Sequence, residues 1–96
     1  MAQIRCAARI ARDLDRLHAF MAEQAAPAVA ERAIQAIIEA IGLLERHPQI
    51  GCPAEQGLRE LVISYGRTGH IALYRFDPLP DHVRVLALRH QREFDY

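Results

Sequence analysis

Two stretches with helical periodicity meet at a proline, and this junction constrains the fold of the chain more than any other feature. In the first stretch, which begins after Ala8, apolar residues recur at intervals of three and four: Ile10, Leu14, Leu17 and Met21. The second has a broader apolar stripe of Ala30, Ile34, Ile37, Ile38, Ile41 and Leu44. Proline is costly inside a helix but suits its first turn. We therefore expect two amphipathic helices, packed as an antiparallel hairpin, with the second starting near Pro27.

Three runs rich in β-branched and aromatic residues follow a loop at 46–57 and predict three strands. They cover residues 58–65, 70–76 and 82–89, with turn residues at 66–69 and 77–81 between them. A short strand is also expected at 3–8. The chain is therefore predicted to be an α+β protein of order β-α-α-β-β-β. A helical hairpin would pack on one face of a small twisted antiparallel sheet, in one domain spanning residues 1–96.

The balance of charge limits the function of the chain. All twelve basic residues are arginine, which excludes lysine chemistry, and they match twelve acidic residues for a net charge of zero. Such a chain has no bulk attraction to nucleic acid or to an anionic membrane, so we expect no specific nucleic-acid binding by the chain alone. No apolar run reaches the roughly 18 residues of a membrane span, which favours a cytoplasmic protein. Cys6 and Cys52 match neither a redox motif nor a zinc motif and are expected to be reduced thiols.

Candidate chemistry is concentrated near the C-terminus. The five histidines are scattered without metal-ligand spacing, and phosphate-binding or hydrolase motifs are absent, so we expect no metal and no cofactor. At the C-terminus, arginine could stabilise the charge of RNA cleavage while His90 or Tyr96 moves protons. Alternatively, these are surface arginines paired with Glu93, Asp95 and helix acids, with Tyr96 as a closing aromatic. Arg59, at the entry to a strand, could bind the carbonyls of the preceding loop.

Four sequence segments, taken in order, resemble those of a known family. They are Leu44 to Pro48 followed by Gly51, the run LRELVI at 58–63, the run IALYR at 71–75, and the run VLALRHQR at 85–92. In this order and spacing, the chain resembles the RelE/ParE superfamily of toxins from type II toxin-antitoxin modules. The resemblance covers almost the whole chain.

The resemblance implies one of two activities. RelE-like members are ribosome-dependent endoribonucleases that cleave mRNA, whereas ParE-like members inhibit DNA gyrase and need no catalytic residues. The zero net charge, the absence of a lysine pair, and Ile71 at a position where a catalytic arginine would be expected favour the ParE-like branch, with its association with plasmid stabilisation. In the RelE-like alternative, His90, Arg92 and Tyr96 would be the catalytic residues.

The resemblance also implies two protein partners, DNA gyrase and a ParD-like antitoxin. Arginine is enriched at interface hot spots, so the expected gyrase-binding residues lie on a basic rim of Arg59, Arg75, Arg89, His90 and Arg92. An antitoxin would dock an amphipathic helix and an extended segment over apolar side chains of the hairpin, near Leu14, Leu17, Met21, Ile37 and Ile41. Some of these five side chains must face the sheet instead.

Overall fold

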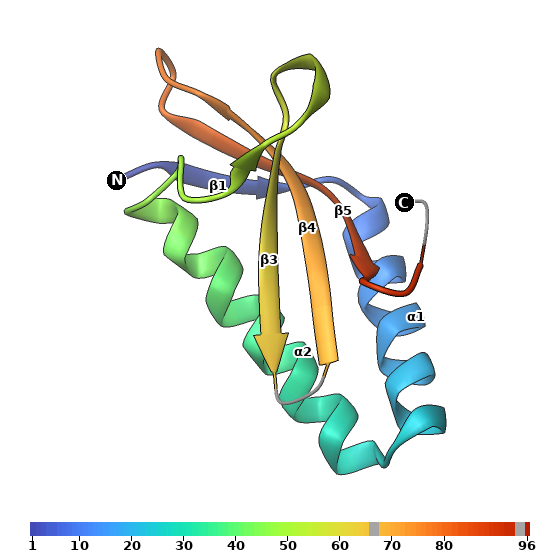
Figure 1. Ribbon diagram of the computed structural model, residues 1–96. Coiled ribbons are helices and arrows are strands. Elements are labelled where there is room, and N and C mark those ends of the chain that lie inside the picture. Colours follow the sequence, from blue (N-terminus) through green and yellow to red (C-terminus); the bar gives the residue numbers. More distant parts are fainter. Residues whose placement is uncertain (66–67, 94–95) are drawn as a thin grey trace.

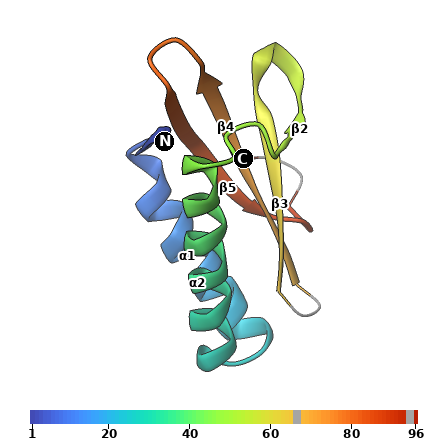
Figure 2. The same ribbon diagram turned by 90° about the vertical axis from the view of Figure 1, so that its left-hand side faces the viewer.

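A hairpin of two helices covers one face of a five-stranded sheet in the computed structural model, which describes residues 1–65, 68–93 and 96 (Figures 1 and 2). Helix α1 spans Arg9–Gln24 and α2 spans Pro27–Gly42. Pro27 is the first residue of α2, where a missing N–H breaks no helical hydrogen bond. The predicted helical hairpin is confirmed, and none of the described helices is long and apolar enough to cross a membrane.

The strands form one mixed sheet in the order β1-β5-β4-β3-β2. Their bounds are β1 Gln3–Cys6, β2 Cys52–Pro53, β3 Arg59–Tyr65, β4 Thr68–Asp77 and β5 His82–His90. Single 3-10 turns occupy Leu43–Glu45 and Glu55–Gly57. Strands β3, β4 and β5 pair antiparallel, as predicted, and so does β2 with β3, but β1 runs parallel to β5. A wholly antiparallel sheet was therefore the wrong expectation for β1, because no tight turn links the first strand to the last one and fixes their relative direction.

The expected loop at 46–57 contains β2 and the second 3-10 turn, so it is more ordered than its proline and glycine content indicated. The expected turn at 66–69 includes Gly66 and Arg67, and the alternative C-terminal pairing includes Asp95. These three residues lie outside the described part of the chain.

Alternation along the strands gives the sheet two different faces. In β4, Ala72 and Tyr74 are fully buried and pack into the core with Leu17, Ile37, Leu44, Val85 and Leu88. The residues that alternate with them along β4, Ile71, Leu73 and Arg75, lie on the opposite side of the sheet, which we call the open face. The register shifts between Leu73 and Tyr74, which are opposite Ala87 and Val85, so β5 has one extra residue there.

Cys6 and Cys52 are both exposed and free. They lie on β1 and β2, the two outermost strands of the sheet. Cys6 shares the helix side of β1 with Ile4, which packs against the core, whereas Cys52 is paired with Glu60 on the open face.

The loop before β3 is fixed by one arginine and one tyrosine. Arg59 donates from Nη1 to the carbonyl oxygens of Gln49 (3.2 Å) and Gly51 (2.8 Å), which confirms the expected role of an arginine at this strand entry. The N–H of Gly51 donates to the hydroxyl of the buried Tyr74 at 2.9 Å. A Cβ at position 51 would lie 2.7 Å from Tyr74 Cε1 and 2.9 Å from the backbone oxygen of Glu60. Only glycine fits there without displacing the backbone.

We predict opposite effects for two glycine-to-alanine changes. Gly51→Ala should lower the free energy of unfolding by about 1 to 3 kcal/mol, because the added methyl overlaps Tyr74 and backbone. Gly42→Ala should raise it by about 0.5 to 1 kcal/mol, since position 42 is helical and a Cβ there meets nothing within 4 Å. Urea unfolding of both variants measures the difference. Equal effects of the two changes would contradict the role assigned to Gly51.

Candidate functional site

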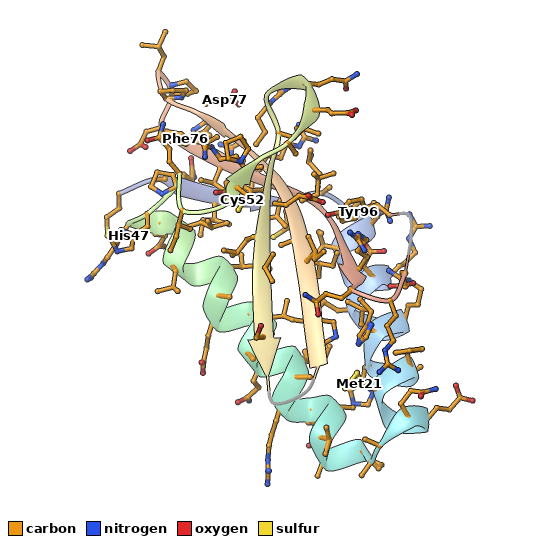
Figure 3. The ribbon with its side chains drawn as sticks, viewed as in Figure 1. Met21, His47, Cys52, Phe76, Asp77 and Tyr96 are labelled. Carbon is orange, nitrogen blue, oxygen red and sulfur yellow. The ribbon has the colours of Figure 1, made fainter. Side chains whose placement is uncertain are left out.

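The buried polar side chains gather where the end of β5 meets α1. Figure 3 shows the side chains on the ribbon, with Tyr96 labelled beside β5. Among the described residues, the buried polar or charged ones are Asp13 on α1, His70 on β4 and His90 on β5. Arg16 and Glu93 lie beside them and are partly exposed. We call these five residues the β5–α1 cluster.

Two side chains of α1 bind the backbone of β5 as a neighbouring strand would. Strand β1 pairs with β5 only as far as Val85, so among the described residues the edge of β5 beyond it has no strand partner. There the N–H of Leu88 donates to Asp13 Oδ2 at 3.0 Å, and Arg16 Nη2 donates to the carbonyl oxygen of Leu88 at 2.9 Å. Both backbone groups of a fully buried residue are therefore satisfied by the helix.

The carboxylate of Asp13 is held ionised by its neighbours. Arg9 donates to it from Nε (3.1 Å) and Nη2 (3.3 Å), and Arg16 Nη2 lies 3.5 Å from Oδ1. Burial alone would raise the pKa of Asp13, but the Leu88 N–H and the two arginines outweigh it, so the pKa is lowered. Sequence analysis missed this residue, although position 13 lies three residues after Ile10 and four before Leu17, on the apolar side of the helix.

The two histidines of the β5–α1 cluster are paired across the sheet and are hidden from solvent. His70 and His90 are 1% and 5% exposed, and their rings meet edge to face with centroids 5.1 Å apart. Burial, reinforced by His90, lowers the pKa of His70 to about 4. Burial and Arg92 also lower the pKa of His90, against the opposing effect of Glu93. Both rings are therefore neutral at pH 7, and His90 Nδ1 accepts the backbone N–H of Arg92 at 3.0 Å.

Two residues after β5, Glu93 and Tyr96, are held on opposite faces of the sheet. The N–H of His90 donates to Glu93 Oε1 at 2.7 Å, and Arg16 Nη1 donates to Glu93 Oε2. On the open face, Tyr96 donates its O–H to Glu60 Oε2 at 2.6 Å, while the Arg89 guanidinium lies 5.2 Å from the centre of the Tyr96 ring. Tyr96 is therefore held against the open face by Glu60 and Arg89.

The residues expected to be catalytic in the RelE-like alternative do not converge on one point. Consecutive residues of a strand point to opposite faces, so Arg89 contacts Tyr96 on the open face while His90 packs against Phe20 on the helix side. Burial and Glu60 raise the pKa of Tyr96 to about 12, which disfavours the phenolate. A buried neutral imidazole and a protonated tyrosine on opposite faces do not form an acid–base pair for one substrate.

The residues expected to bind a target are also dispersed. Arg59 is bonded to the preceding loop, and Arg89 donates to the carbonyl oxygens of His90 and Glu93. Arg75 is exposed on β4, four residues beyond the position paired with Arg89, with its Nε 3.5 Å from Asp77 Oδ1, and Arg92 is exposed after β5. The expected basic rim is therefore not one continuous surface.

The apolar side chains expected to contact an antitoxin are divided between core and surface. Leu17, Met21 and Ile37 are buried within the chain's own core, whereas Leu14 and Ile41 are half-buried. Leu17 and Ile37 pack against the strands and Met21 packs between the two helices, which explains why these three side chains are not accessible.

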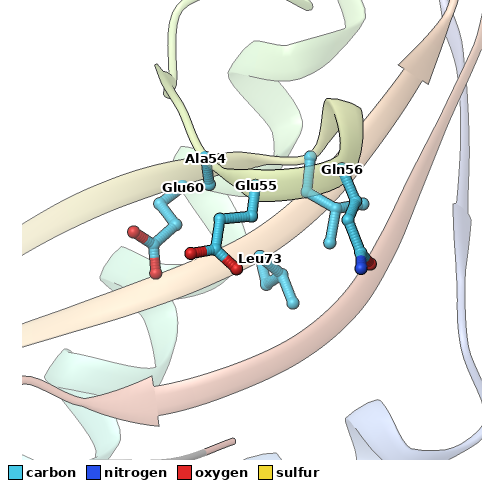
Figure 4. Close-up of a pocket in the computed structure, with 6 residues that line it drawn as sticks. Ala54, Glu55, Gln56, Glu60 and Leu73 are labelled. Atoms are coloured by element: carbon cyan, nitrogen blue, oxygen red, sulfur yellow. The ribbon is translucent and has the colours of Figure 1, made fainter.

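A cavity of about 480 Å³ lies on the open face beneath the loop before β3 (Figure 4). It is lined by Ala54, Glu55, Gln56, Leu58, Glu60 and Leu73. Within the described residues, no three histidine, cysteine or acidic side chains are grouped closely enough to hold a metal ion. The cavity therefore adds an acidic recess, lined by Glu55 and Glu60, to the open face.

Comparison with known proteins shows that this chain is a toxin of the class found in type II toxin-antitoxin systems. The family model described as the ParE toxin of the type II toxin-antitoxin system, parDE, matches residues 4–94. The chain therefore belongs to the ParE toxin family, within the RelE/ParE superfamily.

The proteins similar to this chain include some named RelE or RelBE and one named ParDE. Toxin RelE3 of Caulobacter vibrioides is 33% identical over 93 residues, which are 97% of this chain and 98% of the relative. The chromosomal ParDE system of P. aeruginosa has a chain of the same fold, with a TM-score of 0.76 at 22% identity over 94% of this chain and 96% of that one. The RelBE2 toxin-antitoxin complex of Mycobacterium tuberculosis has a chain with a TM-score of 0.64 at 26% identity, covering 94% and 98%.

We predict that Asp13→Ala destabilises the protein by about 2 kcal/mol, because it leaves the buried Leu88 N–H without an acceptor. Asp15→Ala, an exposed change on the same helix, should alter stability by less than about 0.5 kcal/mol. The folded-state pKa of Asp13 is depressed, so its contribution is present above its ordinary pKa of 3.8 and is lost as the pH falls through the folded value. Urea unfolding should therefore show the two variants converging in strongly acidic buffer. A constant gap down to pH 2 would contradict this assignment.

Proposed function

We propose that this toxin inhibits DNA gyrase by protein–protein contact, does not cleave RNA, and is neutralised by a ParD-like antitoxin. The observation that carries the proposal is the geometry of the C-terminal region. His90 is buried against Phe20, while Tyr96 is bonded to Glu60 on the other face of the sheet. A toxin that acts by contact needs no acid–base pair, whereas cleavage of RNA does.

Charge supports the same proposal. Each phosphate contact with RNA uses a basic side chain, and a nuclease working among ribosomal phosphates gains affinity from a strong positive charge. This chain has a net charge of zero, and two basic groups near the end of β5, Arg16 of α1 and Arg89 of β5, are bonded within the protein. Arginine on a neutral protein is better suited to a protein interface.

The decisive experiment runs two assays with the same purified toxin. We predict loss of supercoiling by DNA gyrase and intact mRNA in a translation-dependent cleavage assay. Cleavage of mRNA in the ribosomal A site with normal supercoiling would replace the proposal with the RelE-like activity, which the name of the Caulobacter relative favours. Tyr96→Phe keeps the ring beneath Arg89 and removes only the hydroxyl, so gyrase inhibition should be unchanged.

We further propose that the antitoxin occupies a groove between α2 and β3, because the expected contact residues on the inner sides of the helices are buried. The groove has a volume of about 460 Å³, and its apolar lining includes Leu43 and Val62, which are 53% and 52% exposed. Beyond Arg59 and Glu60, β3 has no paired neighbour on its outer side among the described residues. An extended antitoxin segment can pair with this edge while apolar side chains fill the groove.

Replacing Leu43 with Asp should weaken binding of the cognate antitoxin at least tenfold, because it puts a charge into an apolar contact. Leu79→Asp provides the matched control, since Leu79 is 99% exposed in the turn between β4 and β5, away from the groove. Titration calorimetry gives the affinities, and thermal unfolding verifies that both variants are folded. Unchanged affinity for Leu43→Asp, or an equal loss for the control, would exclude this groove.

A further inference from the structure

Three arginines lie side by side across the open face. Arg5 on β1 is the register partner of Arg84 on β5, and Arg84 is in turn the partner of Arg75 on β4. Adjacent strands are about 4.8 Å apart, so the three positions span about 10 Å in a line perpendicular to the strands. We call these three residues the arginine row.

Burial of the neighbouring residues places the row on the open face. Val83 and Val85 on either side of Arg84 are fully buried in the core, and so is Tyr74 beside Arg75. Ile4, which precedes Arg5, packs against the same core. Because side chains alternate along a strand, the three arginines point away from the helices, and all three are exposed.

The positive charge of the row is only slightly neutralised by the protein itself. Arg75 makes one ion pair, 3.5 Å long, with Asp77, and both side chains are about half exposed. Arg5 makes one long hydrogen bond of 3.4 Å to Gln3. Arg84, at the centre, has no side-chain hydrogen bond or ion pair in the part of the chain that the structure describes. Like charges directly opposite each other destabilise a sheet, so the free protein gains nothing from this arrangement.

We propose that the arginine row binds an acidic helix of a partner protein. Carboxylates at positions i, i+4 and i+7 lie on one side of a helix and span about 10 Å along its axis, which matches the row. In an extended strand, three residues on the same side (i, i+2 and i+4) span about 13 Å in total, which matches the row less well. Each guanidinium offers paired donors to a carboxylate, so three charge-assisted contacts form in one orientation.

The surroundings of the row favour a short acidic helix over a nucleic-acid backbone. Asp77 lies on the open face two residues beyond Arg75. On the other side, Glu60 is paired with Leu73, two residues before Arg75. Asp77 and Glu60 thus flank the β4 end of the row along the strand direction, and their negative charge repels phosphates that spread beyond the arginines there, whereas three acidic side chains on one helix face reach only the arginines. The inference does not depend on gyrase being the target.

The test measures binding of a synthetic alanine-rich helical peptide with Glu at i, i+4 and i+7, and of a matched peptide with Gln at those positions. The row variant is Arg5→Gln, Arg75→Gln and Arg84→Gln combined. The control variant is Arg12→Gln, Arg32→Gln and Arg46→Gln, three exposed arginines elsewhere, which changes the net charge equally. Fluorescence anisotropy at low salt gives the affinities, and thermal unfolding verifies that both variants are folded.

We expect the wild-type protein and the control variant to bind the Glu peptide, with the row variant at least tenfold weaker and the Gln peptide not bound. Affinity for the Glu peptide should fall as salt is raised. An equal loss of affinity for the Glu peptide in both variants would show that net charge alone determines binding and would overturn the proposal. The absence of binding by the wild-type protein would also overturn it. Row-dependent binding of a 12-nucleotide single-stranded RNA tighter than that of the Glu peptide would overturn it in favour of a nucleic-acid surface.

Discussion

The attachment of β5 to α1 through the backbone of Leu88 is the interaction on which the rest of the structure depends. Strand β1 is too short to cover the whole edge of β5, and an uncovered backbone inside the protein would be costly. Asp13 and Arg16 supply the missing acceptor and donor, and the charge of Asp13 is neutralised by Arg16 and Arg9. Arg16 also binds Glu93, so the position of Glu93 follows from the helix packing.

This attachment divides the toxin into two surfaces with different properties. The helix side of the sheet is filled by apolar side chains and by the neutral histidine pair, and it holds the domain together. The open face carries exposed arginines on β1, β5 and β4, and the Tyr96–Glu60 contact on β3. A scaffold of this kind can change its binding partner by altering the open face without repacking its core, since residues on the two faces alternate along each strand.

The sequence predicts those parts of the fold that depend on local spacing. The periodicity around Leu17 and Ile37 indicates which side of each helix is buried, and the proline at position 27 marks the junction. The role of Arg59 is also predictable, because it acts on a loop only a few residues away. By contrast, the parallel pairing of β1 and the bond between Asp13 and Leu88 join residues more than 70 positions apart. The burial of His90 depends on the same long-range packing, so a histidine near the C-terminus looked accessible when it is not.

The positions of the two cysteines have a consequence for how the toxin behaves under oxidising conditions. Cys6 and Cys52 are on opposite edges of the sheet and point to opposite faces, so they cannot be bridged within one folded molecule. Each folded molecule instead offers two outward thiols. Oxidation would therefore join separate toxin molecules into disulfide-linked chains and would add no internal cross-link to the domain.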